Sequence, residues 1–127
     1  MGKPVEHSVR FLNLVDDAKM RIKETSVEKI MMRIRMGEKL ILVDVCTERE
    51  FLLSHVQSSR HLGKGVIERD VEKYYHDLDE EIILYCGGGF RSALAADSLQ
   101  KMGYTRVYSM EGGFRASKKA GGTISLA

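Results

Sequence analysis

The chain has little of what marks several special classes of protein. Its 127 residues include two cysteines, one proline and no tryptophan. Two cysteines are too few for a disulfide scaffold, and one proline with no low-complexity tract argues against a disordered chain. No apolar run has the length of a signal peptide or a membrane span, so we expect a cytoplasmic protein.

Neither sign of charge is in large excess. The formal net charge is +2, which gives no reason to expect a nucleic acid or a membrane as the partner. Hydrophobic residues make up 43% and charged residues 30% of the chain, as in an ordinary globular protein. The length suits one domain that buries a core.

Helical and strand patterns alternate along the chain. This order predicts an α/β fold with a central, mainly parallel sheet of about five strands flanked by helices. The apolar runs at 40–45 and 82–85 are typical of strands that are covered on both faces. Ser26 is expected to cap a helix that Gly37 ends. Further strands are expected at 22–25, 60–62 and 106–110, and helices at 9–20, 48–53, 66–75 and 92–102.

The predicted organisation has three parts. Residues 1–25 form an N-terminal extension with a helix, and residues 26–120 form the main α/β domain, which ends in a short basic helix near Lys119. Residues 121–127 are predicted to be a loose tail.

A glycine-rich loop follows the buried strand at 82–85. It reads Cys86-Gly87-Gly88-Gly89-Phe90-Arg91-Ser92 and leads into a helix. Ligands bind at the carboxyl ends of strands in open parallel sheets. Glycines allow loop amides to converge on one point at the positive end of the next helix. A thiol at that point is stabilised as its anion, so Cys86 is predicted to be a nucleophile.

The rest of this loop is predicted to hold the same anion. Arg91 offers a permanent charge and a forked donor, and Ser92 could bond the sulfur or cap the helix. Backbone donors are expected from Gly87, Gly88, Gly89 and Phe90. The alternative for Cys86, taken from the loop alone, is a buried core thiol at a tight turn.

Asp44 and Cys46 at the end of the other buried strand are supporting candidates. If the two strands are neighbours, Cys46 lies at the same sheet edge as Cys86. It could then resolve a persulfide or form a disulfide, or it could simply fill space. Asp44 could anchor the active loop by accepting backbone hydrogen bonds, or be an ordinary strand-end carboxylate.

Motifs across residues 26–119 resemble those of rhodanese-like domains. They are Leu42-Val43-Asp44-Val45 with the acidic-aromatic helix after it (Glu48, Glu50, Phe51), His55-Val56, the loop from Cys86 to Ser92, and the run from Val107 to Phe114. The resemblance implies a parallel α/β fold and transfer of sulfane sulfur through a cysteine persulfide. In this family, Cys-x4-Arg loops resemble sulfurtransferases, and related phosphatases use a loop one residue longer. The spacing from Cys86 to Arg91 is the shorter one.

The chain departs from the family pattern in three places. The second motif usually reads Gly-His-Ile-Pro-Gly-Ala and is Ser54-His55-Val56-Gln57-Ser58-Ser59 here. Cys46 stands where the first motif usually ends in Arg, and the last helix lacks the usual Trp near Ser117. These changes bear on a local turn and on the packing of the last helix.

The resemblance implies that Cys86 takes sulfur from thiosulfate or a persulfide donor. It would pass the sulfur to cyanide or a thiol, including a sulfur-accepting protein partner. No cofactor is implied, and the histidines lack metal-ligand spacing with either cysteine, so no metal is expected. Two alternatives stay open. One is a cysteine-dependent phosphatase or arsenate reductase, and the other is a non-catalytic sulfur carrier or partner-binding module.

Overall fold

The computed structural model describes residues 7–115 and 124–126. Its centre is a five-stranded sheet in which every pairing is parallel, with strand order β1-β6-β5-β2-β4. The strands are β1 (Lys23–Thr25), β2 (Ile41–Asp44), β4 (Arg60–His61), β5 (Ile82–Tyr85) and β6 (Val107–Met110). The predicted α/β fold with a central parallel sheet is confirmed.

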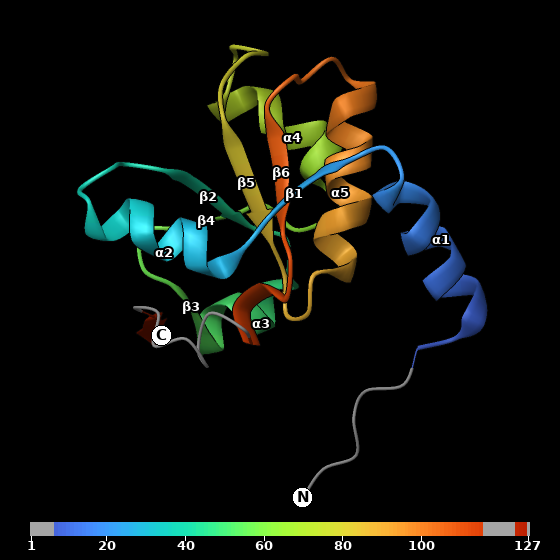
Figure 1. The fold of residues 1–127 in the computed structure, drawn as a ribbon, viewed down its shortest axis with the longest axis horizontal. Coiled ribbons are helices and arrows are strands. Elements are labelled where there is room, and N and C mark those ends of the chain that lie inside the picture. Colours follow the sequence, from blue (N-terminus) through green and yellow to red (C-terminus); the bar gives the residue numbers. More distant parts are fainter. Residues whose placement is uncertain (1–6, 116–123, 127) are drawn as a thin grey trace, which may run out of the picture.

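Helices cover both faces of this sheet (Figure 1). They are α1 (Val9–Lys19), α2 (Val27–Arg35), α3 (Glu48–Leu53), α4 (Ile67–Tyr74) and α5 (Phe90–Lys101). Helix α2 packs on one face, α4 and α5 pack on the other, and α1 lies on the outer side of α5. Within the described residues, no helix is long and apolar enough to cross a membrane.

The two signals predicted at the ends of α2 act as expected. The Ser26 hydroxyl accepts a hydrogen bond from the Lys29 N–H at 3.2 Å, so it caps α2. Gly37 follows α2 with φ of +87°, the left-handed conformation in which glycine ends helices. Helix α3 begins with a reciprocal capping box between Thr47 and Glu50.

Strand β5, at the centre of the sheet, is buried on both faces. Residues Ile82 and Leu84 of β5 point into a core with α4 and α5, whereas Ile83 and Tyr85 point into a core with α2. All four are at most 1% exposed. Burial of one such side chain stabilises the fold by about 1.5–3 kcal/mol. Because Cys86 directly follows β5, this buried strand fixes the position of Cys86 in the fold.

The N-terminal extension is tied to the sheet and to α5. Strand β1 lies where a strand was predicted, and it pairs with β6 at the edge of the sheet. The Arg21 guanidinium bonds the Asp97 carboxylate of α5 with distances of 2.8 and 3.0 Å. Helix α1 is thereby fixed beside the helix that carries the first residues after the glycine loop.

The altered second motif keeps its turn at some cost. Ser58 has φ of +69°, a left-handed conformation that favours glycine. It stands where the family motif usually has its second Gly. The turn therefore forms without glycine, and Ser59 supports it by donating to the Val56 carbonyl at 2.7 Å.

Residues 124–126 of the predicted loose tail form a strand, and the rest of that tail lies outside the described residues. Strand β7 (Ile124–Leu126) pairs antiparallel with β3 (Ser54–Val56). The short β3 offers backbone groups that need partners, and an extended tail supplies them. Of the predicted basic helix, residues 113–115 are helical, and residues 116–119, with Ser117, lie outside the described residues.

Candidate active site

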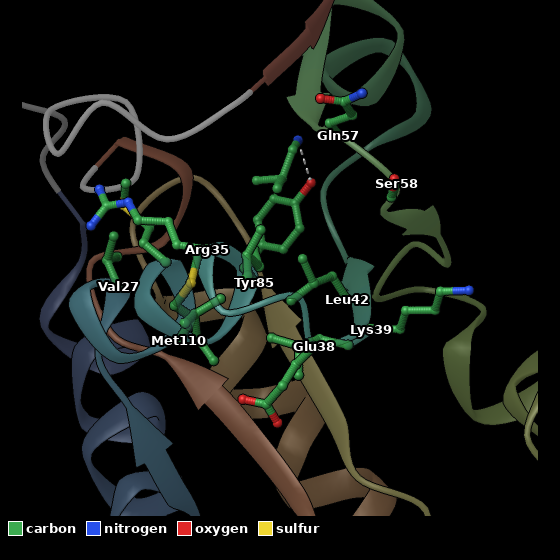
Figure 2. Close-up of a pocket in the computed structure, with 14 residues that line it drawn as sticks. Val27, Arg35, Glu38, Lys39, Leu42, Gln57, Ser58, Tyr85 and Met110 are labelled. Carbon is green, nitrogen blue, oxygen red and sulfur yellow. Dashed lines mark hydrogen bonds between the residues drawn. The ribbon is translucent and has the colours of Figure 1, made fainter.

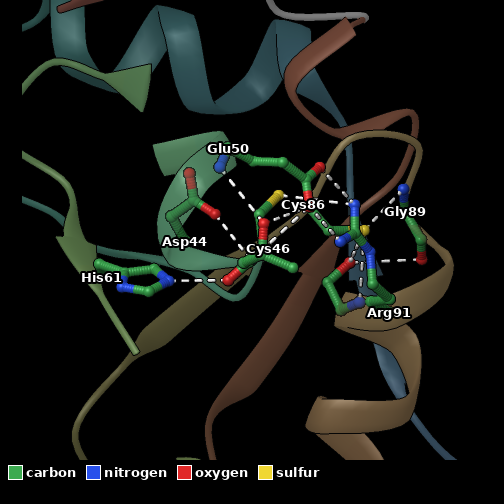
Figure 3. Close-up of polar contacts among 9 residues, drawn as sticks. Asp44, Cys46, Glu50, His61, Cys86, Gly89 and Arg91 are labelled. Carbon is green, nitrogen blue, oxygen red and sulfur yellow. Dashed lines mark hydrogen bonds and ion pairs between the residues drawn. The ribbon is translucent and has the colours of Figure 1, made fainter. Parts of the chain in front are cut away.

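Cys46 and Cys86 lie at the same edge of the sheet. Strands β2 and β5 are neighbours, and their register places Asp44 opposite Tyr85. The Val45 N–H donates to the Tyr85 carbonyl at 2.9 Å. Both thiols belong to the core on the α4 and α5 side (Figure 3). The condition that made Cys46 a candidate is therefore met, since the two strands are neighbours, and both cysteines are free thiols.

The Cys86 sulfur accepts hydrogen bonds from the backbone of its own loop. The Gly89 N–H donates at 3.1 Å and the Ser92 N–H at 3.4 Å. Gly89 has φ of +95° and is the N-cap of α5, so the sulfur lies at the positive end of that helix. Converging amides and the helix dipole both stabilise a sulfur anion. The side chain itself is only 1% exposed.

The segment after β6, residues 111–115, bonds to the outer side of this loop. The Phe114 N–H donates to the Cys86 carbonyl at 2.7 Å, and the Arg115 N–H donates to the Gly87 carbonyl at 3.1 Å. A peptide's N–H points opposite to its carbonyl, so these bonds turn the next two loop amides away from the segment. A Cβ on Gly113, whose φ is +59°, would collide with the Cys86 carbonyl. Glycine is therefore required for this close approach.

A buried pair of hydroxyls supports the loop from beneath. The Ser92 and Ser109 hydroxyl oxygens are 2.7 Å apart, and Ser92 Oγ lies 3.7 Å from the Cys86 sulfur. Both serines are fully buried. The predicted contact of Ser92 with the sulfur is present. Ser109 was not anticipated, because a small residue inside a strand gives no local signal.

Arg91 lies at the rim of the loop, with its fork directed toward α3. Its two terminal nitrogens donate to the Glu50 carboxylate at 2.7 and 3.0 Å, and one lies 3.7 Å from the Cys46 sulfur (Figure 3). The hydrogen bonds from Arg91 lower the pKa of Glu50 to about 2. Glu50 was predicted only as a motif residue. The sequence did hold a signal for this pair: Glu50 and Arg91 have opposite charges, and they follow β2 and β5, which end at the same edge of the sheet.

A second guanidinium lies on the loop and was also missed. Arg115 Nε donates to the Gly87 carbonyl at 3.2 Å, and its guanidinium packs over the α-carbon of Gly88. A Cβ on Gly88 would collide with this side chain. The signal in the sequence was a basic residue directly after the Gly112-Gly113 turn.

Asp44 and Cys46 serve their own loop. The Asp44 carboxylate accepts from the Cys46 N–H at 2.8 Å, which makes it a local strand-end carboxylate and not an anchor of the Cys86 loop. His61 Nε2 lies 2.7 Å from the Cys46 carbonyl. Burial, with the nearby Asp44 charge, raises the pKa of the Cys46 thiol far above its ordinary value. Cys46 therefore stays protonated at neutral pH.

Phe90 was predicted as a backbone donor of the loop, and its side chain packs elsewhere. Helix α5 begins at Phe90, two residues earlier than expected. The ring packs against the N-terminal segment, with centroids 4.9 Å from His7 and 6.3 Å from Phe11. An apolar ring at the first turn of α5 is covered by α1, a contact that a local reading of the loop could not reveal.

A separate cavity of about 470 Å³ lies on the other face of the sheet, beside α2 (Figure 2). Its walls are mainly apolar, and Tyr85 closes one side, with its hydroxyl accepting from the Val56 N–H at 3.0 Å. Neither cysteine is among the described residues that line it. The cavity is thus distinct from the edge that carries Cys86.

Comparisons with known proteins identify the family. The family model described as "Rhodanese-like domain" matches residues 26–120. The chain is 34% identical over 105 residues to YqhL of Bacillus subtilis, an uncharacterised protein, covering 82% of this chain and 77% of the other. It is 35% identical over 74 residues to the thiosulfate sulfurtransferase GlpE of Ectopseudomonas mendocina, covering 58% of this chain and 66% of that one.

A solved structure shares the whole fold. It is a Rhodopseudomonas palustris protein of unknown function, described as a possible tyrosine phosphatase. It is 27% identical, has a TM-score of 0.79, and the match covers 98% of this chain and 100% of that one. With the matching family model, these relatives show that this chain belongs to the rhodanese-like domain family.

Proposed function

We propose that this protein is a sulfurtransferase that carries sulfane sulfur on Cys86. The Cys86 thiolate attacks the outer sulfur of thiosulfate, a new sulfur–sulfur bond forms, and the bond to the sulfonate sulfur breaks. Sulfite leaves with the electron pair, and Cys86 becomes a persulfide anion. Cyanide or a thiolate then takes the outer sulfur and returns the Cys86 thiolate. Atoms and charge balance in both steps without an oxidant.

The observation that carries this proposal is the set of donors around one sulfur. Two backbone N–H groups, from Gly89 and Ser92, donate to Cys86 Sγ at the N-terminus of α5. The donors that stabilise a thiolate can also hold a persulfide anion, which bears the same charge one atom further out. The curated relative GlpE, named as a thiosulfate sulfurtransferase, supports this chemistry.

The other site residues act on this centre in the proposal. The positive charge of Arg91 adds to the attraction for an anion at the loop, although the Glu50 carboxylate occupies its fork. Asp44 and Cys46 shape the neighbouring loop and take no part in the transfer. The substrates are small sulfur anions and thiol or cyanide acceptors, a protein thiol among them. The free thiols suit the reducing cytoplasm.

Phosphate-ester hydrolysis is the main rival, because a structural relative is described as a possible tyrosine phosphatase. Steady-state assays separate the two. We expect thiocyanate formation from thiosulfate and cyanide, with the parallel double-reciprocal lines of a ping-pong reaction, and no phosphate release from an aryl phosphate. Phosphate release without thiocyanate formation would contradict the proposal.

A non-catalytic carrier is the second rival. Such a protein would take up sulfur once per chain but show no steady-state turnover with cyanide or a dithiol. We expect turnover with both acceptors, since the loop geometry stabilises the thiolate that leaves in the second step as well as the one that attacks in the first.

A further inference from the structure

The guanidinium groups of Arg91 and Arg115 at the Cys86 loop differ in their hydrogen-bond partners. Arg91 is bound through two nitrogens to the Glu50 carboxylate. Arg115 donates only through Nε, to the Gly87 carbonyl. Its two terminal nitrogens have no acceptor within the described ranges 7–115 and 124–126, and no carboxylate there is in salt-bridge distance of them. Within these ranges, the fork of Arg115 is therefore free, whereas that of Arg91 is occupied.

The position of Arg115 is set by the same bonds that hold the loop. Its backbone N–H and its Nε both donate to the Gly87 carbonyl, at 3.1 and 3.2 Å. The guanidinium packs over Gly88, where only a residue without a Cβ leaves room for it. The charge is thus placed within two residues of Cys86 along the loop, and the side chain is exposed to incoming solutes.

We propose that Arg115 binds the sulfonate end of an oxyanion sulfur donor and so selects donors of the thiosulfate class. This inference rests on the proposed function. A sulfonate presents oxygens that a guanidinium fork can bond in pairs. With the outer sulfur directed at Cys86, the three oxygens of thiosulfate lie toward the loop's outer rim. Charge grows on them as sulfite departs, and Arg115 stabilises that charge.

The test compares two donors on the full-length protein. Thiosulfate carries the sulfonate, whereas a small alkyl persulfide such as 2-hydroxyethyl persulfide delivers the same sulfur without an oxyanion group. The rate of Cys86 persulfide formation is measured against donor concentration by rapid quench and intact-protein mass spectrometry. The variants are Arg115→Gln, Arg115→Lys and a matched control, Arg106→Gln. Arg106 is an exposed arginine next to β6 at the opposite end of that strand.

Arg115→Gln should raise the thiosulfate concentration for half-maximal loading about tenfold, the loss expected for a charge-assisted hydrogen bond. Loading from the alkyl persulfide should stay within about twofold, since that donor has no oxyanion to bind. Arg115→Lys should recover most of the thiosulfate loading because it keeps the charge. The dependence of thiosulfate loading on ionic strength should weaken in Arg115→Gln, and Arg106→Gln should match the parent protein.

Three results would overturn the inference. An unchanged thiosulfate dependence in Arg115→Gln would show that the residue does not bind the donor. An equal loss with both donors would show that Arg115 only holds the loop. Failure of the parent protein to load from either donor would defeat the proposed function, and this inference would fall with it. That last outcome is recognised before any variant is made.

Discussion

Two thiols lie at one edge of one sheet, and the structure treats them oppositely. Cys86 follows β5 and receives two backbone hydrogen bonds on its sulfur. Cys46 follows β2, its sulfur faces one arginine nitrogen at 3.7 Å, and its backbone N–H is held by Asp44. Both are nearly fully buried. The difference therefore comes from the loop that follows each cysteine.

The two loops differ in where their amides point. After Cys86, three glycines let the chain turn back so that amides reach the sulfur. After Cys46, Thr47 caps α3, and the first-turn amide of Glu50 is satisfied by the Thr47 hydroxyl. Among the described residues, no backbone amide of this loop donates to the Cys46 sulfur, and its one donor there is the Arg91 guanidinium. The same element order thus places two backbone donors on the sulfur at one strand end and leaves a buried, protonated thiol at the other.

Replacing the Cys86 nucleophile should have the largest effect on activity. Cys86→Ser should lower thiocyanate formation by about a thousandfold or more, because loss of a covalent nucleophile removes the pathway. Thermal unfolding of the variant should stay close to that of the parent protein. A variant that retains a tenth of the activity or more would contradict the assignment of Cys86.

Disturbing the loop while keeping the thiol should have the next largest effect. Gly113→Ala places a Cβ against the Cys86 carbonyl, which must displace the loop, and turnover should fall about a hundredfold if amide donors carry the stabilisation. Gly37→Ala is the matched control. Its φ is also left-handed, at +87°, but a Cβ there meets nothing within 4 Å.

Both alanines should cost stability of about 1–3 kcal/mol from backbone strain, measured by chemical unfolding. Only Gly113→Ala should also lose turnover, and Gly37→Ala should keep the turnover of the parent protein. Equal turnover in the two variants would show that the bonds from the segment after β6 do not position the loop.

Releasing Arg91 from α3 should have a modest effect. Glu50→Gln removes the carboxylate that occupies the fork, so the half-saturating thiosulfate concentration should fall about twofold. The pair is partly exposed, so its loss should cost under about 1 kcal/mol of stability at neutral pH. An increase in that thiosulfate concentration would contradict this role for Glu50.

The pH dependence of that stability follows from the direction of the Glu50 shift. Its pKa is lowered from 4.5 to about 2 by Arg91. The charged pair therefore stabilises the folded state above pH 4.5, and the contribution is lost as the pH falls from 4.5 toward 2. The difference in unfolding free energy between the parent protein and Glu50→Gln should shrink in that window, and a constant difference would count against the pair.

Replacing the second thiol should have the smallest effect. Cys46→Ser should leave turnover within about twofold, because a thiol whose pKa is raised by burial is not a nucleophile at neutral pH. Sensitivity to peroxide should also be unchanged. A marked fall in either measurement would show that Cys46 resolves the persulfide and would remove the contrast between the two strand ends.

The parts that the sequence predicted well are those coded by neighbouring residues. The helix cap at Ser26, the stop at Gly37 and the loop from Cys86 to Ser92 each depend on a few contiguous residues. The sheet followed from two apolar runs with helices between them. Local backbone chemistry decides these features, so a reading of short segments finds them.

The parts that the sequence missed depend on contacts between distant segments. The partner of Arg91 is 41 residues away, and the segment that bonds the Cys86 carbonyl is 28 residues away. The packing of Phe90 on α1 and the pairing of β7 with β3 are also distant contacts. Such contacts depend on which elements the fold brings together. The charge of a residue and its spacing in the sequence do not determine which distant residue it contacts.

The central claim is that the loop makes Cys86, and not Cys46, the carrier of sulfur. Intact-protein mass spectrometry after incubation with thiosulfate tests it most directly, on the parent protein, Cys86→Ser and Cys46→Ser. We expect a gain of one sulfur atom in the parent protein and in Cys46→Ser, reversed by cyanide, and no gain in Cys86→Ser. A gain that persists in Cys86→Ser, or no gain in any of the three with thiosulfate or a persulfide donor, would contradict it.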